Sequence, residues 1–352
     1  MTSASTRTQA PVIWFNDLGI HDRPVAGGKG ASLGEMTGAG LPIPPGFVIS
    51  TQAFNLWLHE LDQAHAIRSR ITALDKDDLP AIQRCTADIR ALIEHEPLSA
   101  QLHDIIAASY AQLGTNVPVA VRSSATSEDS AEASFAGLQD TYLWIQGTDE
   151  LISKVRSCWA SLYSPESVSY RLRLNLPEAQ LAMGVVVQRM VHSHTSGVMF
   201  TRSPTTGDRS VITIEGSWGL GSAIVSGEVT PDRFVVNKVT GEIRTRVVAD
   251  KAIEHVPAVS GGVLEQEVSE ERRKQCSLAD AQIHALVALG KKVEQHYGSP
   301  QDIEWALDQE GSIQLLQSRP ETVWATKERA PVAKPAARPF DHIFNLMGGL
   351  KK

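Results

Sequence analysis

The chain has 352 residues, of which 42% are apolar and 21% are charged, and its formal net charge is −7. This length and balance predict a soluble globular protein with two compact domains or one large two-lobed domain. The negative charge argues against a nucleic-acid partner, which needs a positive surface, but a few Lys and Arg residues suffice to bind a phosphate.

Membrane insertion and secretion are not expected from the sequence. No segment approaches the roughly 20 continuous apolar residues that cross a bilayer, and the N-terminal MTSASTRTQAP has no apolar run of a signal peptide. Three widely spaced cysteines (Cys85, Cys158 and Cys276) form no CxxC pair, which predicts reduced structural thiols. We therefore expect a cytoplasmic protein with no membrane partner.

The first third of the chain predicts one strand pair and a helical block. Residues 1–11 are polar and are expected to be disordered, and a strand is expected at 12–15. A Gly-rich stretch, a short helix near 31–36 and an extended, Pro-rich path lead to a second strand ending at Ser50. Apolar residues at helical spacing then predict helices over 51–114.

From residue 118 onward, strands are mixed with helices. The predicted strands are VPVAVR (117–122), TYLWI (141–145), 182–191, 196–202, 210–215, 233–237, 301–307 and 312–317. Two helices are expected over 149–175 and one long helix over about 268–297. Because these elements do not alternate strictly as βαβ units, the pattern predicts an α+β fold. The last residues, 325–352, form a Pro/Ala-rich linker and a short apolar tail, which either folds back or docks on a partner.

Two segments of the first half carry groups suited to phosphate. AGGKGASLGEM (26–36) places Lys29 among glycines just before a helix, whose N-terminus favours an anion. VAVRSSATSEDSAEASFAGLQDTYL (119–143) ends a buried strand at Arg122, whose guanidinium can hold phosphate oxygens bidentately. The small, hydroxyl-rich loop that follows, with Gly137 near its end, is typical of a lid. A solvated Gly-rich turn and an ordinary surface loop are the alternatives.

The segment QDIEWALDQEGSIQLLQSRPET (301–322) predicts a hairpin with its turn at 308–312. Asp302 and Glu304 alternate on one strand and face one side, as do Gln317 and Arg319 on the other. Carboxylate and amide oxygens are the hard ligands that magnesium prefers. Glu304 lies between apolar residues and therefore requires a compensating partner.

A fourth segment, EGSWGLGSAIVSGEVTPDRFVV (215–236), carries glycines around Trp218 and Leu220. This density of glycine predicts a backbone held close to another group. The dinucleotide fingerprint GxGxxG is not matched.

Together, in this order and spacing, the four segments and SGVMFTRSPTTGD resemble the nucleotide-binding domain of phosphoenolpyruvate synthase and pyruvate phosphate dikinase, which rifampin phosphotransferase shares. The resemblance covers about residues 12–324. It implies an ATP-grasp fold with nucleotide between two lobes, here expected at 12–200 and 201–324.

Matched by position, the resemblance assigns roles to nine residues. Lys29, Arg122 and Arg319 would act on the triphosphate, with Asp302 beside them and Gly137 in the lid. Glu304 and Gln317 would hold Mg²⁺, and Gln188 and the backbone near Met190, in the segment VVVQRMV (185–191), would meet the adenine of ATP.

Enzymes of this family also carry a phosphorylatable histidine and an acceptor domain, which are not recognised in this sequence. His194, in VHSHTSG, is interpreted as a loop histidine between two strands. We therefore expect the ATP-binding subunit of a split dikinase, phosphorylating a histidine on a separate partner subunit and releasing AMP. Phenylphosphate synthase, with phenol as acceptor, is the nearest architectural parallel, and a split phosphoenolpyruvate synthase acting on pyruvate is the alternative.

Three other interpretations of the same sequence remain open. The chain could be an expressed fragment of a longer enzyme. It could be a regulatory subunit with a vestigial nucleotide site, which the complete set of Lys29, Arg122, Glu304, Gln317 and Arg319 disfavours. It could also be an ATP-grasp carboxylate ligase that acts alone and forms ADP.

Overall fold

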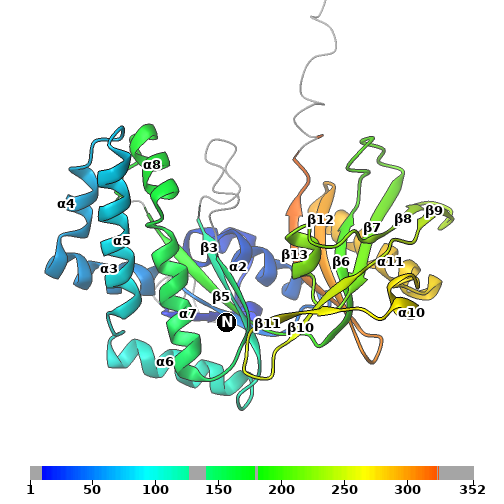
Figure 1. The fold of residues 1–352 in the computed structure, drawn as a ribbon, viewed down its shortest axis with the longest axis horizontal. Helices are drawn as coiled ribbons and strands as arrows, with labels where there is room; N and C mark the ends of the chain where they lie inside the picture. The colour runs from blue at the N-terminus through cyan, green and yellow to red at the C-terminus, as the bar shows by residue number, and fades with distance from the viewer. Residues whose placement is uncertain (1–9, 127–139, 179–180, 323, 325–352) are drawn as a thin grey trace, which may run out of the picture.

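The computed structural model describes residues 10–126, 140–178, 181–322 and 324. Within these ranges the chain forms two lobes, each built on its own antiparallel sheet (Figure 1). Residues 1–9, the predicted lid glycine Gly137 and the segment 325–352 lie outside the described residues. Pro11, at the end of the segment expected to be disordered, accepts the backbone N–H of Ser50 at 2.8 Å.

The first lobe contains a five-stranded sheet. In sheet order its strands are β1 (Val12–Trp14), β2 (Gly46–Ile49), β5 (Met183–Arg189), β3 (Val119–Ala125) and β4 (Thr141–Ile145). Strands β2 and β3 are buried along their whole length. The first half of β3 is apolar, whereas its second half buries Arg122, Ser123 and Ser124.

Helices account for the rest of the first lobe. They are α2 (Arg23–Gly38), α3 (Thr51–His65), α4 (Ile67–Thr72), α5 (Leu79–His95), α6 (Ala100–Leu113), α7 (Thr148–Ser161) and α8 (Pro165–Leu174), with short 3-10 turns η1 (Phe15–Asp17) and η2 (Ile20–Asp22). Ser50, Asp78, Ser99 and Ser164 cap four of these helices through their side chains. The apolar faces of α3, α5, α6 and α7 form one core with the sheet. Helical structure was predicted at 51–114 and is found there.

The second lobe contains a six-stranded sheet. In sheet order its strands are β13 (Ile313–Pro320), β12 (Gln301–Asp308), β6 (Ser193–Phe200), β7 (Val211–Trp218), β8 (Asp232–Asn237) and β9 (Ile243–Val247). Helix α11 (Asp280–Tyr297) packs Ile283, Leu286 and Val293 into the core of this sheet. The short helices α9 (Ser222–Val225) and α10 (Glu270–Arg273) and the hairpin of β10 (Ile253–Pro257) and β11 (Val263–Glu267) complete the lobe.

Two sequence-based boundaries differ from the structure. Strand β6 pairs with β12 and β7, so the second sheet begins at Ser193, whereas the first lobe was expected to extend to residue 200. The helix predicted over 268–297 is interrupted, and its long part begins at Asp280. Backbone groups before that point bond to the sheet instead: Ser277 donates its N–H to Asp232, and the Arg272 carbonyl accepts from Trp218.

The two lobes contact each other on two sides. Helix α2 of the first lobe meets β13 and α11: Ser32 donates to the Ser318 carbonyl at 2.8 Å, and Glu35 pairs with His296 at 2.7 Å. On the other side, the β10–β11 hairpin reaches β4, where Gly262 donates its N–H to the Trp144 carbonyl at 3.0 Å. Because both sides are bridged, the space between the sheets has fixed walls.

The described residues also bear on redox chemistry and membranes. Cys85, Cys158 and Cys276 all lie in the described part and are free thiols, as expected. Burial raises the pKa of the Cys158 thiol, so it stays protonated and unreactive. No helix among the described residues combines the length and apolar character that crossing a membrane would require.

A fully buried ion pair organises the second lobe. Lys251 donates to Asp232 at 2.6 Å and both side chains are 0% exposed. Asp232 also accepts the backbone N–H groups of Ala249 and Ser277, which fixes the chain on both sides of the hairpin. A buried carboxylate with three donors is satisfied only while Lys251 is present.

Replacing Lys251 with Met is predicted to lower the free energy of unfolding by about 3–5 kcal/mol, because it leaves Asp232 charged and buried without its cation. Chemical denaturation measures the change. The control is Arg273→Gln, which removes the exposed partner of Asp250 and should leave the denaturation midpoint nearly unchanged. Equal effects of the two substitutions would contradict this account.

Candidate active site

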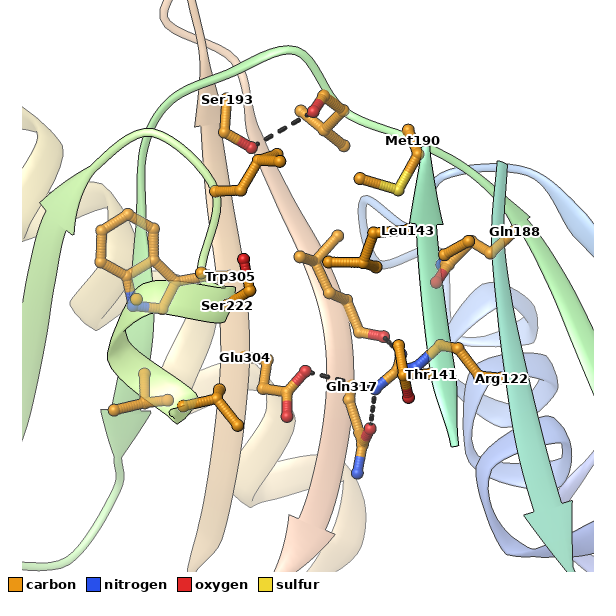
Figure 2. Close-up of a pocket in the computed structure, with 18 of the residues that line it drawn as sticks. Arg122, Thr141, Leu143, Gln188, Met190, Ser193, Ser222, Glu304, Trp305 and Gln317 are labelled. Atoms are coloured by element: carbon orange, nitrogen blue, oxygen red, sulfur yellow. Dashed lines mark hydrogen bonds and ion pairs between the residues drawn. The ribbon is translucent and has the colours of Figure 1, made fainter. Parts of the chain in front are cut away.

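A cavity of about 500 Å³ lies between the two sheets. Figure 2 shows its walls, with Arg122, Thr141 and Gln188 on strands of the first lobe facing Glu304 and Gln317 on strands of the second. Of the nine residues singled out from the sequence, seven line it: Lys29, Arg122, Gln188, Met190, Glu304, Gln317 and Arg319. The sequence therefore predicted the convergence of Lys29 and Glu304, 275 positions apart, on one cavity.

Arg122 is the centre of the polar end of this cavity. It lies at a buried position of β3, and its guanidinium crosses to the second lobe, where it donates to Glu304 Oε2 at 3.3 Å and to Gln317 Oε1. Its Nη1 donates to the Leu316 carbonyl at 3.2 Å. Glu304 itself is half-buried, and the compensating partner expected for it is an arginine from the other lobe.

The hairpin of β12 and β13 aligns its four polar residues as predicted. Glu304 lies opposite Gln317, and Asp302 lies opposite Arg319, so both pairs lie on one face. A register shift follows Glu304, because Trp305 pairs with Leu315 and leaves Leu316 unpaired. This bulge frees the Leu316 carbonyl to accept from Arg122.

Lys29 is placed by a break in helix α2. Gly27 has φ +71°, a left-handed conformation, and divides the helix two residues before the lysine. Ser124 of β3 holds the break from both sides: its Oγ donates to the Ala26 carbonyl at 2.8 Å and accepts the Gly30 N–H at 3.1 Å. A Cβ on Gly27 would lie 2.0 Å from the Ser124 carbonyl oxygen, so only glycine fits.

The opposite end of the cavity is mainly apolar. Leu143, Met190, Val191 and Leu220 line it together with Gln188, whose amide donates to the Pro44 carbonyl at 3.4 Å. The Met190 N–H donates to the Pro118 carbonyl at 2.9 Å. That N–H is thus engaged within the protein, which leaves the cavity-facing side chains of this segment to meet a ligand.

Asp302 lies on the face of Glu304 but does not line the cavity. Burial raises its pKa to about 6 and nearby Glu321 adds to the shift, while Arg319 opposes it from 3.6 Å. The Arg319 side chain is 61% exposed, so water screens its charge and burial prevails. The Asp302–Arg319 pair, whose cation is exposed, therefore differs from the Glu304–Arg122 pair, whose cation is buried.

The Gly-rich segment after β7 forms one wall of the cavity. Leu220, Gly221, Ser222, Val225 and Ser226 line it. Gly219 has φ +72°, and a Cβ there would lie 2.4 Å from the His255 carbonyl oxygen. The close backbone approach expected from this glycine density is confirmed.

His194 was expected in a loop, but it lies in strand β6. Pairing with β12 continues to Ser193, and the His194 carbonyl accepts the N–H of Gly219, which follows β7. Its ring packs edge-on against Trp218 at 5.3 Å. Burial lowers its pKa, and the Arg272 charge acts in the same direction. It does not line the cavity and has no part in the site.

Several residues of the site were not identified from the sequence. Those that line the cavity are Thr141, Leu143, Arg189, Val198, Ser222, Trp305 and Leu316, and Ser124 lies outside it and supports the helix break before Lys29. Period-2 alternation could have indicated Thr141 and Leu143, because they lie on the same face of the strand TYLWI. No local pattern indicates Ser124 or Leu316, since their roles arise from contacts with distant segments.

The described cavity lining is electropositive although the chain is acidic. It contains Lys29, Arg122, Arg189 and Arg319 but the single carboxylate Glu304. Such a concentration of cations, with an apolar end beside it, suits a ligand with an anionic and an aromatic part.

Residues 23–338 match the family described as pyruvate phosphate dikinase, AMP/ATP-binding domain. The chain belongs to this family. It is 42% identical over 316 residues to a probable phosphoenolpyruvate synthase of Methanothermobacter thermautotrophicus, covering 88% of this chain and 46% of the relative. It is also 38% identical over 370 residues to phosphoenolpyruvate synthase of Pyrococcus furiosus, covering 92% and 45%. Rifampicin phosphotransferase of a Streptomyces species is 42% identical over 312 residues, covering 88% and 36%.

The chain thus spans less than half the length of these curated relatives. Membership of the dikinase AMP/ATP-binding family, together with the two-lobed α+β architecture and its central cavity, confirms the ATP-grasp fold class expected from the sequence. The chain therefore carries the AMP/ATP-binding domain of the pyruvate phosphate dikinase family.

Replacing Gly27 with Ala is predicted to lower the free energy of unfolding by about 2 kcal/mol or more, because the new Cβ meets Ser124 and the left-handed conformation disfavours alanine. The same change should displace Lys29 and weaken binding of ATP to this dikinase domain. Gly38→Ala in the same helix has open space around its Cβ and should be neutral or slightly stabilising. Denaturation and calorimetric titration with ATP measure both effects, and equal behaviour of the two variants would contradict the placement.

Asp302→Asn is predicted to change stability in a pH-dependent way in the metal-free chain. The folded state holds the Asp302 proton more tightly than the usual value of 3.8 implies, so this group favours folding fully below about pH 4 and loses that contribution as pH rises through about 6. Asparagine does not titrate, so the Asp302→Asn variant does not lose this contribution to stability as the pH rises. Its free energy of unfolding relative to the parent should rise by up to about 3 kcal/mol between acid and neutral pH. Denaturation in chelator across this range measures it, and a constant or falling difference would show that Asp302 is not raised.

Proposed function

We propose that this chain is the ATP-binding subunit of a split dikinase, which uses Mg·ATP to phosphorylate a histidine on a partner subunit. The observation that carries the proposal is the convergence of Lys29, Arg122 and Arg319 with Glu304 and Gln317 in one interlobe cavity. Phosphoryl transfer needs positioning and charge neutralisation more than covalent help from the protein, and these residues supply both.

The residues present fit a magnesium ion. Glu304 and Gln317 lie opposite each other on β12 and β13, and each offers a hard oxygen ligand to the same point, where both now accept from Arg122. They would hold Mg²⁺, which would neutralise phosphate charge. Arg122 would then donate to phosphate oxygens in place of its present acceptors.

The remaining groups divide the work along the cavity. Lys29 and Arg319 would bind the outer phosphates, while Gln188 and the side chain of Met190 would contact the base at the apolar end. Asp302 would orient Arg319 through its ion pair.

In the proposed reaction, a ring nitrogen of the partner's histidine attacks the β-phosphorus of ATP, and AMP leaves with the bridging oxygen. Water then removes the terminal phosphoryl as inorganic phosphate, which leaves phosphohistidine. The final acceptor binds on the partner, and we propose phenol, following the two-part architecture of phenylphosphate synthase. Pyruvate, the acceptor of a split phosphoenolpyruvate synthase, is the alternative.

The chain alone is predicted to bind Mg·ATP and to form little AMP, because the phosphoryl acceptor is on another protein. Co-purification with tagged chain and mass spectrometry for phosphohistidine identify that protein, and adding it should produce AMP, phosphate and phosphohistidine. Rapid formation of ADP by the isolated chain would overturn the proposal and favour a ligase-type activity.

Glu304→Gln is expected to reduce AMP formation in the reconstituted system by about 100-fold or more, because loss of a group that only supports a metal ligand already costs about 10–100-fold, while leaving partner binding intact. The matched control is Glu215→Gln on β7, which pairs with Arg233 outside the cavity and should keep full activity. An active Glu304→Gln variant would instead indicate a regulatory nucleotide site. Supplying phenol or pyruvate to the phosphorylated partner, with product detection by phosphorus NMR, separates the two acceptors.

A further inference from the structure

A chain of hydrogen bonds leads from the surface of the second lobe into the cavity. Glu228 Oε2 lies 3.0 Å from His255 Nε2, and His255 Nδ1 lies 2.7 Å from Ser222 Oγ. Ser222 lines the cavity and His255 does not. None of the three was singled out from the sequence for a role, and the phosphate chemistry described above does not use them.

The Glu228 carboxylate fixes the direction of the first hydrogen bond, and the direction of the second follows for a neutral His255 ring. A carboxylate only accepts, so the Nε2 of His255 carries the proton that is donated to Glu228. In the neutral ring Nδ1 is then an acceptor, and Ser222 donates its hydroxyl proton to it. Ser222 Oγ therefore presents lone pairs, and no proton, to the cavity.

An oxygen of this kind matches a hydroxyl donor and repels a phosphate oxygen. Figure 2 shows Ser222 between Met190, at the apolar end of the cavity, and Glu304 and Gln317, at the polar end. A nucleotide that spans these two ends, with its base near Met190 and its phosphates near Glu304, places its sugar beside Ser222.

We propose that Ser222 accepts a hydrogen bond from a ribose hydroxyl of the bound nucleotide, and that His255, held by Glu228, is the positioning residue that makes Ser222 an acceptor. The proposal rests on the proposed function, since it deepens the same ATP site. It assigns the chain a preference for ribonucleotides over deoxyribonucleotides through a relay that ends on the protein surface.

The backbone supports the same arrangement. Leu220 donates its N–H to the His255 carbonyl at 2.9 Å, and Gly219 approaches that carbonyl closely because it lacks a Cβ. The Gly-rich wall and strand β10 are thus fixed to each other, and the Ser222–His255 bond does not depend on side-chain rotamers alone. Glu265 of β11 also faces His255, with a carboxylate oxygen within 4.8 Å of the ligand atoms of His255 and Glu228.

The test is calorimetric titration with the magnesium complexes of ATP, 2′-deoxy-ATP and 3′-deoxy-ATP. The full chain is expected to bind one deoxy analogue about five- to tenfold more weakly than ATP, the value of one hydrogen bond. Ser222→Ala should bind ATP and that analogue equally. His255→Ala should lose the discrimination as well, and His255→Asn, whose side-chain oxygen can accept from Ser222, should restore part of it.

Glu265→Gln is the matched control, because it changes the charge beside His255 without touching the relay, and it should keep the discrimination of the parent chain. Thermal melts confirm that each variant is folded. If the parent binds Mg·ATP without discriminating, or if Ser222→Ala weakens all three nucleotides alike or keeps the parental ratio, the relay proposal fails while the ATP site stands. If the parent does not bind Mg·ATP at all, the proposed function fails as well.

Discussion

The guanidinium of Arg122 is the constraint on which the site depends. It starts from a buried strand of the first lobe and ends on three oxygens of the second, those of Glu304, Gln317 and Leu316. A charge that is 8% exposed costs free energy unless such partners surround it. The hairpin of β12 and β13 supplies these partners. Two are side chains, and the third, the Leu316 carbonyl, is free to accept because the bulge removes it from the pairing of the two strands. The two lobes are therefore registered at the point where the ligand phosphates are expected.

In the proposed complex with Mg·ATP, this interaction would be exchanged. Glu304 and Gln317 cannot serve Arg122 and a metal ion with the same lone pairs, so the nucleotide would bring the anionic oxygens that replace them for arginine. Contacts outside the cavity do not take part in this exchange: Ser32 and Glu35 of α2 bond to β13 and α11, and the hairpin tip at Gly262 bonds to β4. The bridges between the lobes are therefore separate from the groups that would change partners.

The sequence predicted what local periodicity and short motifs encode. Alternation placed Asp302 with Glu304 and Gln317 with Arg319, and a cationic partner was correctly expected for Glu304 from its apolar neighbours in the strand, although its side chain is only half-buried. Residues whose roles come from distant contacts were missed. Ser124 holds the break at Gly27 from 97 positions away. The helix expected from residue 268 is interrupted because Ser277 donates its N–H to Asp232. Neither effect has a signature within a window of ten residues. The ligand itself, and the roles that the resemblance assigns, follow from family membership and not from periodicity.

The charge of the site follows from the difference between its two acidic residues. Glu304 pairs with Arg122 and offsets one cation, whereas burial raises the pKa of Asp302 to about 6, so Asp302 offsets the exposed Arg319 only in part once the pH falls toward that value. Among the described residues the cavity thus keeps an excess of positive charge in a chain whose net charge is −7. A polyphosphate is attracted to that excess, and the negative surface elsewhere disfavours its binding at other places. Full ionisation of Asp302 above that pH strengthens its ion pair with Arg319, so the Arg319 side chain becomes better oriented as the net positive charge of the site falls. As the pH rises, ionisation of Asp302 therefore orients the Arg319 side chain better and at the same time lowers the net positive charge that attracts an anion.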